Sequence, residues 1–432
     1  MLQAEEQMMR ALVFVVQMTP IGTNLGLLSM MWAMVNGSFL QSRGAIFSAL
    51  SLNGFTPEEV RRSWAAMRNG AWKISELIAE WNLYVTSENA CQENQYAGLR
   101  VVSIDITGFW RPKLQGWLVK HYHSVAGKAL PAVVLGVMVT SGQVQGRRIP
   151  LLQAIVRRES ESSEADFRGE LLKAAASRPQ SECEVKVVDG GFGLREIHAA
   201  KLKKYVVRMA KNGTARRNVL PTYKGKGRHP TYGLKVRPLA RKHKGKMIPA
   251  TAPEQISEFE VEGRMIQVHS WSDLVTSTTQ VSPDATTFFI HVFYYPAYKT
   301  PLILVTDLDI SAENIYLIYK DRWTVEQPPL AAKQMIGLHR QFVFTKEACF
   351  RLPELALLAG NVLTYVAATL PAIPTGFWDR NPQSTPGRLR RFLAQVIFPN
   401  LSGFSPEIRK KNSPTDHLPK GADAPRQKPL AA

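Results

Sequence analysis

The sequence predicts an α/β protein in which a mixed β-sheet with flanking helices follows a helical N-terminal region. A change of pattern along the 432 residues is the main evidence. Residues 1–90 have apolar stretches and helix-start signals, whereas apolar runs of strand length begin at residue 101. These runs come as three strands, a helix and another strand, an order typical of a mixed sheet covered by helices. The 45% hydrophobic content is that of a globular protein with a core.

The N-terminal region, residues 1–95, is expected to be helical. Residues 11–42 contain no charged side chain, but the polar segment Thr19–Asn24 interrupts them. Neither flank is a continuous apolar run of the ~20 residues that a membrane span needs. The acidic start at Glu5 and Glu6 is unlike the basic start of a signal peptide. We therefore expect buried helices, with the Met and Trp side chains of residues 29–34 in the core rather than in a cofactor pocket.

A pair of helices is predicted over residues 56–81. Thr56 followed by Pro57 and two glutamates is a typical helix start. A second helix is expected over Trp72–Trp81, after the turn Arg68-Asn69-Gly70. Two helices so joined are typical of a DNA-binding helix-turn-helix and also of a plain helical hairpin. The hairpin is favoured because it is the commoner packing unit, and DNA binding by this region stays open.

The α/β part is divided by a basic insertion. Residues 96–210 are assigned to the first part of the core, with strands over Val101–Phe109, Ala132–Thr140, Arg148–Val156, Glu184–Val188 and Tyr205–Met209 and a helix over Glu164–Ala176. A β-rich insertion is assigned to residues 211–300, with strands over Glu258–His269 and Thr286–Tyr294. Residues 301–345 return to the core with a strand over Pro301–Thr306 and a helix capped by Ser311. Residues 346–403 form a C-terminal region that is helical over 346–398, and residues 404–432 are predicted to be a disordered tail.

Basic charge is concentrated in one segment. The chain has 54 Lys and Arg against 35 Asp and Glu, a net charge of +19. Between Arg195 and Lys246 there are 17 basic residues and one acid, Glu196, so this segment alone contributes +16. Such a segment suits a flexible arm lying along nucleic-acid phosphates. A solvated surface is the alternative, and the asymmetry of the charge favours nucleic acid.

Cysteine and histidine give weaker signals. The three cysteines, Cys91, Cys183 and Cys349, are far apart in the sequence and form no zinc-like pair, so we expect reduced thiols in a cytosolic protein. His121 and His123 could be half of a metal site, but no further ligands are near in the sequence, and a surface or packing role is favoured.

Two aspartates lie in or directly after predicted strands. Asp105 is in the middle of the first core strand, and Asp189 follows a short apolar strand and precedes two glycines. A charged side chain in a buried strand is costly unless it is paired or binds a metal. Carboxylates on adjacent strand ends, together with one more acid, can hold two hard cations about 4 Å apart. Each aspartate taken singly could equally be a turn former or a salt-bridge partner.

The strongest signal is a spaced set of polar residues near the end of the core. Its order is Tyr319, two residues, Arg322, three residues, Glu326, six residues, Lys333. On a continuous helix these positions share one face. That face would hold one carboxylate among a phenol, a guanidinium and an ammonium, which suits metal binding beside phosphate. Ion pairs on an amphipathic helix are the alternative for any one of these residues.

Together these residues resemble the DDE transposases of bacterial insertion sequences, in the branch marked by a Tyr-Arg-Glu-Lys signature (insertion-sequence-four-like). The spacing match is complete, and Arg322-Trp323-Thr-Val-Glu326 resembles the Arg-Trp-x-aliphatic-Glu centre of that signature. The resemblance extends over about residues 101–338, roughly half of the chain.

The resemblance implies an RNase H-like catalytic core with a β-rich insertion before the third acid. It implies that Asp105, Asp189 and Glu326 bind two Mg²⁺ ions, for which Mn²⁺ can substitute, and catalyse strand nicking and strand transfer. It further implies that Tyr319, Arg322 and Lys333 contact DNA phosphates at the transposon end. The expected partners are transposon-end and target DNA and a second copy of the chain in the DNA complex, with no membrane. The expected location is the bacterial cytoplasm, at the nucleoid, and excision through a DNA hairpin is a weaker implication.

Two departures from the family pattern stand out. Gly190 occupies the position after the second aspartate, where the family commonly has arginine, so one phosphate contact is absent or comes from elsewhere. Pro328 and Pro329 follow Glu326 closely, so the helix either restarts near Gln327 with proline in its first turn or kinks.

Other functions are compatible with the same residues. A related nuclease, or a domesticated derivative that does not transpose, would keep the three acids. A non-catalytic DNA-binding protein with the same fold is disfavoured by their presence.

Overall fold

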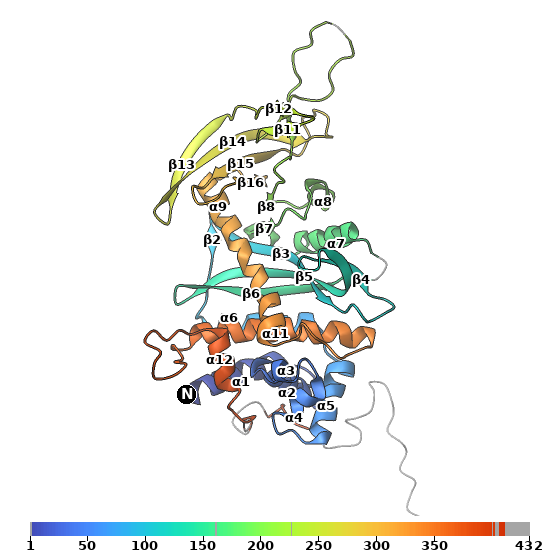
Figure 1. The fold of residues 1–432 in the computed structure, drawn as a ribbon, viewed down its shortest axis with the longest axis vertical. Helices are drawn as coiled ribbons and strands as arrows, with labels where there is room; N and C mark the ends of the chain where they lie inside the picture. The colour runs from blue at the N-terminus through green and yellow to red at the C-terminus, as the bar shows by residue number, and fades with distance from the viewer. Residues whose placement is uncertain (1, 160–161, 226, 400, 402–405, 411–432) are drawn as a thin grey trace, which may run out of the picture.

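The computed structural model describes residues 2–159, 162–225, 227–399, 401 and 406–410. The molecule is elongated, with a helical layer at one end, a large mixed sheet in the middle and a β-rich insertion at the other end (Figure 1). The predicted α/β class, a mixed sheet with flanking helices, is confirmed.

The helices that precede the sheet form most of the helical layer. They are α1 (Leu2–Val16), α2 (Thr23–Val35), α3 (Ser38–Gln41), α4 (Ile46–Ser51), α5 (Pro57–Asn69) and α6 (Ile74–Glu88). Thr56 caps α5, accepting a hydrogen bond from the backbone N–H of Glu59, as its sequence predicts. The uncharged helix α2 is enclosed by its neighbours, and Met30, Met31, Trp32 and Met34 are fully buried. These side chains are core residues, as expected.

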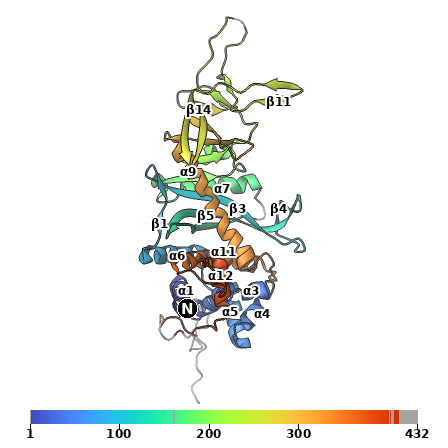
Figure 2. The ribbon, with the colours of Figure 1, turned by 60° about the vertical axis from the view of Figure 1, so that its left-hand side comes forward.

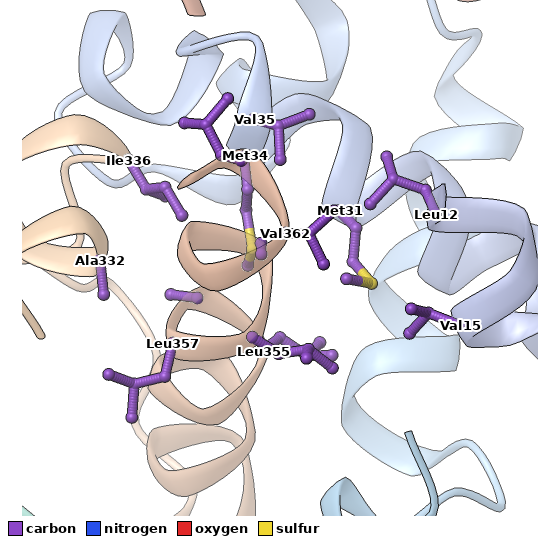
Figure 3. Close-up of a cluster of buried hydrophobic side chains, with 14 of the residues drawn as sticks. Leu12, Val15, Met31, Met34, Val35, Ala332, Ile336, Leu355, Leu357 and Val362 are labelled. Atoms are coloured by element: carbon purple, nitrogen blue, oxygen red, sulfur yellow. The ribbon is translucent and has the colours of Figure 1, made fainter. Parts of the chain in front are cut away.

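Helix α11 (Lys346–Thr369) runs between these helices and the sheet. By length and apolar composition it is the one helix in the described part of the chain that could cross a membrane, but 89% of its apolar window is buried inside the protein. Figure 3 shows α11 packing against α1 and α2 through Leu355, Val362 and Met31. Helix α11 is therefore the central core helix of this layer.

The central sheet contains three long antiparallel strands and two short parallel ones. Its strands are β3 (Leu99–Trp110), β4 (Val119–His123), β5 (Lys128–Val144), β6 (Arg147–Arg157), β7 (Glu184–Val188) and β8 (Tyr205–Arg208), with β1 (Gln92–Glu93) and β2 (Gln95–Tyr96) at its border. The spatial order is β6, β5, β3, β7, β8. Strands β6, β5 and β3 pair antiparallel, whereas β3, β7 and β8 run parallel.

Helices cover both faces of this sheet. Helices α7 (Glu164–Ala176) and α8 (Leu194–Ala199) pack on one face through Leu171, Leu172 and Ile197. The other face meets α11 beside β5 and β6, and α9 (Ala312–Asp321) beside β3 and β7. Because side chains alternate along a strand, the odd-numbered residues of β3 and β7 point to this second face. Val101, Val185 and Val187 accordingly share a hydrophobic cluster with Ile315 and Ile318 of α9.

The insertion extends the same sheet away from the helical layer. Its strands are β9 (Ala215–Arg217), β10 (Lys235–Val236), β11 (Arg241–His243), β12 (Lys246–Ile248), β13 (Gln255–Val261), β14 (Arg264–Thr276) and β15 (Phe288–Tyr294), followed by β16 (Leu302–Thr306). Strand β16 pairs with both β8 and β15, so core and insertion are continuous. The short β11–β12 hairpin is separate and projects from the side of the insertion (Figure 2).

The chain from α9 to α11 changes its helical winding several times. Helix α9 leads into a 3-10 turn (Arg322–Glu326), then α10 (Gln327–Leu330), and then a π-helical turn (Ala331–Met335). Pro328 and Pro329 lie in the first turn of α10, so the predicted restart of the helix near Gln327 is confirmed. Helix α12 (Pro386–Leu393) follows α11.

Some sequence predictions differ from the structure in detail. The strand predicted over Glu258–His269 is a hairpin, because Glu262 and Gly263 both have positive φ and form the turn between β13 and β14. The helix predicted over 346–398 is α11 and α12, with residues 370–385 between them mostly non-helical. Residues 406–410 of the predicted disordered tail lie against the N-terminal helices, where Gly22 N donates to Arg409 O (3.1 Å) and Lys410 pairs with Glu59 (3.3 Å). Residues 404–405 and 411–432 lie outside the described residues.

Candidate functional site

The first two predicted acids lie side by side. The parallel register of β3 and β7 pairs Ile104 with Val188, so the next position on each strand is Asp105 and Asp189. Their odd numbers place both on the sheet face that α9 covers. Each is partly exposed. The apolar strands on both sides therefore bring two carboxylates to one point at the edge of the core.

The signature segment, residues 319–333, approaches these acids through Tyr319 and Arg322. The Tyr319 hydroxyl donates a hydrogen bond to Asp189 Oδ1 (3.3 Å). The Arg322 guanidinium lies 5.7 Å from the centre of the Tyr319 ring and donates to Glu326 Oε1 (2.8 Å). Burial disfavours its charge, but Tyr319, Asp189 and Glu326 together raise the pKa of Arg322. Arg322 is therefore the positive centre of an acidic site.

Asp105 is the most strongly perturbed acid of this group. Burial raises its pKa to about 6, while a hydrogen bond from the Ile106 N–H (2.8 Å) and the charge of Arg322 oppose the rise. The negative charges of Glu326 and Asp189 raise the same pKa further. Both of the other predicted acids thus act electrostatically on Asp105. Such a cluster of acids, one with a perturbed pKa, is typical of functional sites.

Lys333 approaches the acids from the π-helical turn. Its ammonium donates to Thr107 Oγ1 (2.8 Å) and lies 4.8 Å and 5.1 Å from the ring centres of Trp110 and Phe109. Burial lowers its pKa to about 8, and the charge of Asp105 partly offsets this. Thr107 is two residues after Asp105 on the same face of β3. The structure therefore places all six predicted site residues around the middle of β3 and the C-terminal end of β7: Asp105, Asp189, Tyr319, Arg322, Glu326 and Lys333.

The binding of Mg²⁺ by the three acids stays a prediction. Carboxylate oxygen is the donor type that Mg²⁺ prefers, so the chemistry of Asp105, Asp189 and Glu326 fits a hard cation. In the described part of the chain, however, no three acidic, histidine or cysteine side chains are grouped closely enough to hold a metal ion as they stand. The Arg322–Glu326 ion pair gives a physical reason, because a guanidinium now supplies the positive charge. His121 and His123 contact the Trp110 ring, which agrees with a packing role.

Sequence reasoning missed three residues of this site. Thr107 holds Lys333, and its position two residues after Asp105 was the available signal. Burial raises the pKa of Tyr319, and the charge of Arg208, the exposed last residue of β8, opposes this rise. A cation therefore lies near the partner of Asp189 although Gly190 itself supplies none. Asp321, inside the signature segment, is fully buried, and its side chain contacts four residues of three other segments. No local pattern marks Asp321, because its partners are far away in sequence.

The basic segment lies mainly in the insertion, on α8, β8 and the strands β9 to β12. Among the described basic residues of this segment, Lys204 and Arg217 pair with acids, Glu182 and Glu254. None of the described basic residues is buried. Most of the charge is therefore uncompensated and open to an anionic partner.

Of the two helices α5 and α6, the second contains no basic residue, whereas α5 exposes Arg61 and Arg68. Helix α6 buries Leu77, Trp81 and Tyr84, and exposes Glu76 and Glu88. A recognition helix that enters a DNA groove needs an exposed basic or polar face. Helix α6 thus lacks the basic face of a recognition helix, and the choice between a plain hairpin and a helix-turn-helix stays a prediction.

Comparisons with protein-family models and with curated proteins find no match for this chain.

Proposed function

We propose that this chain is a metal-dependent DNA transposase, which binds the ends of its element, cleaves them and joins them to target DNA. The observation that carries the proposal is the convergence of Asp105, Asp189 and Glu326 around Arg322, with Tyr319 and Lys333 on either side. Acids that act on one another beside phosphate-binding cations suit phosphoryl transfer.

The topology supports an RNase H-like core. Three antiparallel strands followed by two parallel ones, with α7 crossing from β6 to β7, give the mixed sheet expected of that fold. The first acid lies in the first of these strands and the second directly after the fourth, and the third acid follows the insertion at the end of the 3-10 turn after α9. This order of acids along the chain agrees with the resemblance found in the sequence.

The chain's own residues would bind and orient the DNA strand. Arg322 can form two parallel hydrogen bonds to a phosphate, and Lys333 and Tyr319 can each donate one. When a phosphate binds Arg322, the Arg322–Glu326 ion pair opens and the Glu326 carboxylate becomes available to a cation. Two Mg²⁺ ions held by Asp105, Asp189 and Glu326 would supply an activated water and stabilise the leaving 3′ oxygen.

The insertion would supply most of the non-specific affinity. The β11–β12 hairpin projects from the side of the insertion (Figure 2). It carries three exposed lysines that form no ion pair with a described acid, residues 242, 244 and 246. Contacts between lysines and phosphates depend on salt and not on base sequence.

Two variants of the same charge change provide the test. Glu326→Gln removes an acid of the site, whereas Glu313→Gln removes an exposed acid in the first turn of α9. Each protein is assayed for binding to duplexes carrying the gene's flanking sequences in Ca²⁺, then for cleavage and strand joining in Mg²⁺. We expect Glu326→Gln to lose cleavage by several orders of magnitude with equal or tighter binding, and Glu313→Gln to behave as wild type.

The outcomes separate the candidate functions. Cleavage without joining would identify a nuclease rather than a transposase. Binding without any metal-dependent cleavage by the wild type would leave a DNA-binding protein, and unimpaired cleavage by Glu326→Gln would refute the assignment of the third acid.

A further inference from the structure

A buried carboxylate lies at the junction between α9 and the 3-10 turn. Asp321 has no exposed surface. Its Oδ2 accepts hydrogen bonds from Asn94 Nδ2 (2.8 Å), Tyr96 OH (3.1 Å) and Ser141 Oγ (3.1 Å). Its Oδ1 lies 2.9 Å from Arg148 Nε. One side chain is thus bound to β2 and the residue before it, to β5 and to β6.

The backbone of the same residue is also held. The Asp321 carbonyl accepts hydrogen bonds from Thr324 Oγ1 (2.8 Å) and Ser103 Oγ (3.5 Å). Thr324 and Ser103 are both fully buried. Position and rotation of the chain are therefore fixed at this residue by β3 as well.

Asp321 lies between the site residues Tyr319 and Arg322. At ~100° per residue, residues 319 and 322 lie about 200° and about 100° around the helix axis from residue 321, so fixing the direction of residue 321 fixes theirs. The orientation of Tyr319 toward Asp189, and of Arg322 toward Glu326, therefore depends on where Asp321 is anchored.

Stability alone is a weak explanation for this group. A buried ion pair loses hydration and is often no more stabilising than apolar side chains of similar volume. Buried polar groups with several partners instead fix one arrangement among many. Here that arrangement joins the signature segment to residues 94–96 and to the strands β3, β5 and β6.

We propose that Asp321 is a positioning residue that sets the angle at which Tyr319, Arg322 and Glu326 meet the two aspartates of the sheet, Asp105 and Asp189. This inference rests on the proposed function for its effect on cleavage, but not for its effect on local order. A displacement of about 1 Å at a reacting group can reduce a rate by about 100-fold.

Three variants test the inference. Asp321→Ala removes all side-chain contacts, and Asp321→Asn keeps the shape and one acceptor oxygen. Asp309→Ala is the matched control, because Asp309 is an exposed acid just before α9. Backbone hydrogen exchange over residues 319–326 and the cleavage rate at saturating DNA are measured for each, together with DNA affinity.

We expect Asp321→Ala to exchange at least tenfold faster over residues 319–326 and to cleave about 100-fold more slowly, with little change in affinity. Asp321→Asn should show a smaller loss in both, and Asp309→Ala none. Unchanged exchange in Asp321→Ala would overturn the inference, as would faster exchange with full cleavage. Should Asp321→Ala not fold, Asp321→Asn decides by the same criteria. A wild type without cleavage would refute the proposed function alone, because the exchange measurement stands without it.

Discussion

Neutralising Asp105 should make the protein more stable and, on the proposed function, inactive. The folded state holds the Asp105 carboxyl with a pKa of about 6, against an ordinary value of 3.8. A shift of about 2 units corresponds to about 3 kcal/mol against the ionised form. Asp105→Asn keeps the oxygen that accepts from the Ile106 N–H and removes the charge. At pH 8 without metal, its free energy of unfolding should exceed that of wild type by up to about 3 kcal/mol.

The sign of the pH dependence follows from the direction of the shift. Between about pH 4 and pH 6 the folded wild type binds a proton that the unfolded chain does not, so its free energy of unfolding falls as pH rises through this window. The advantage of Asp105→Asn should therefore be absent near pH 4 and complete above pH 7. Urea unfolding of both proteins in EDTA, followed by tryptophan fluorescence from pH 4 to 8, measures it. An advantage that does not change with pH, or a less stable variant at pH 8, would refute the reasoning.

Three further predictions concern other parts of the molecule. Lys333→Ala should weaken DNA binding by about 1–2 kcal/mol, and wild-type affinity should fall as pH passes about 8 and Lys333 loses its proton, as titrations from pH 7 to 9 would show. Replacing three lysines of the β11–β12 hairpin, residues 242, 244 and 246, with glutamine should weaken the salt dependence of DNA binding. The slope of log K against log salt concentration should fall by about 0.9 per lost phosphate contact, measured between 50 and 200 mM salt. Gly26→Ala should destabilise the protein by about 1–3 kcal/mol, because the added Cβ would lie 2.5 Å from Ala66 Cβ. Gly169→Ala should stabilise the protein by about 0.5–1 kcal/mol, because a Cβ on this open side of α7 meets no other atom. Thermal unfolding of both variants measures these changes.

Local patterns were enough to predict the elements that carry the site. Asp105 and Asp189 stand in or after strongly apolar runs, so their strands could be located before their partners were known. The parallel register that brings them together could not be predicted, because it depends on how α7 returns the chain to the sheet. The hairpin turn at Glu262 was missed because the alternation of β13 continues through it into β14.

Interactions between distant segments could not be predicted from the sequence. Asp321 stands among charged residues of the signature, and nothing next to it indicates a buried position. Its burial arises from Asn94, Ser141 and Arg148, which are 227, 180 and 173 positions away. The Arg322–Glu326 ion pair, by contrast, follows from i,i+4 spacing, and the sequence left it open as an alternative to metal binding.

The changes of winding after α9 explain how Lys333 reaches Thr107. A uniform helix from Tyr319 would place Lys333 by a fixed rotation, but the chain passes through a 3-10 turn, which is tighter than an α-helix, and then a π turn, which is wider. In the π turn, Ile336 N donates to Ala331 O, five residues back. Gly360 of α11 lets this turn come close, since a Cβ there would lie 2.9 Å from Ala331 Cβ. The signature spacing is thus necessary for the site, but the packing of the π turn against α11 decides where its last cation lies.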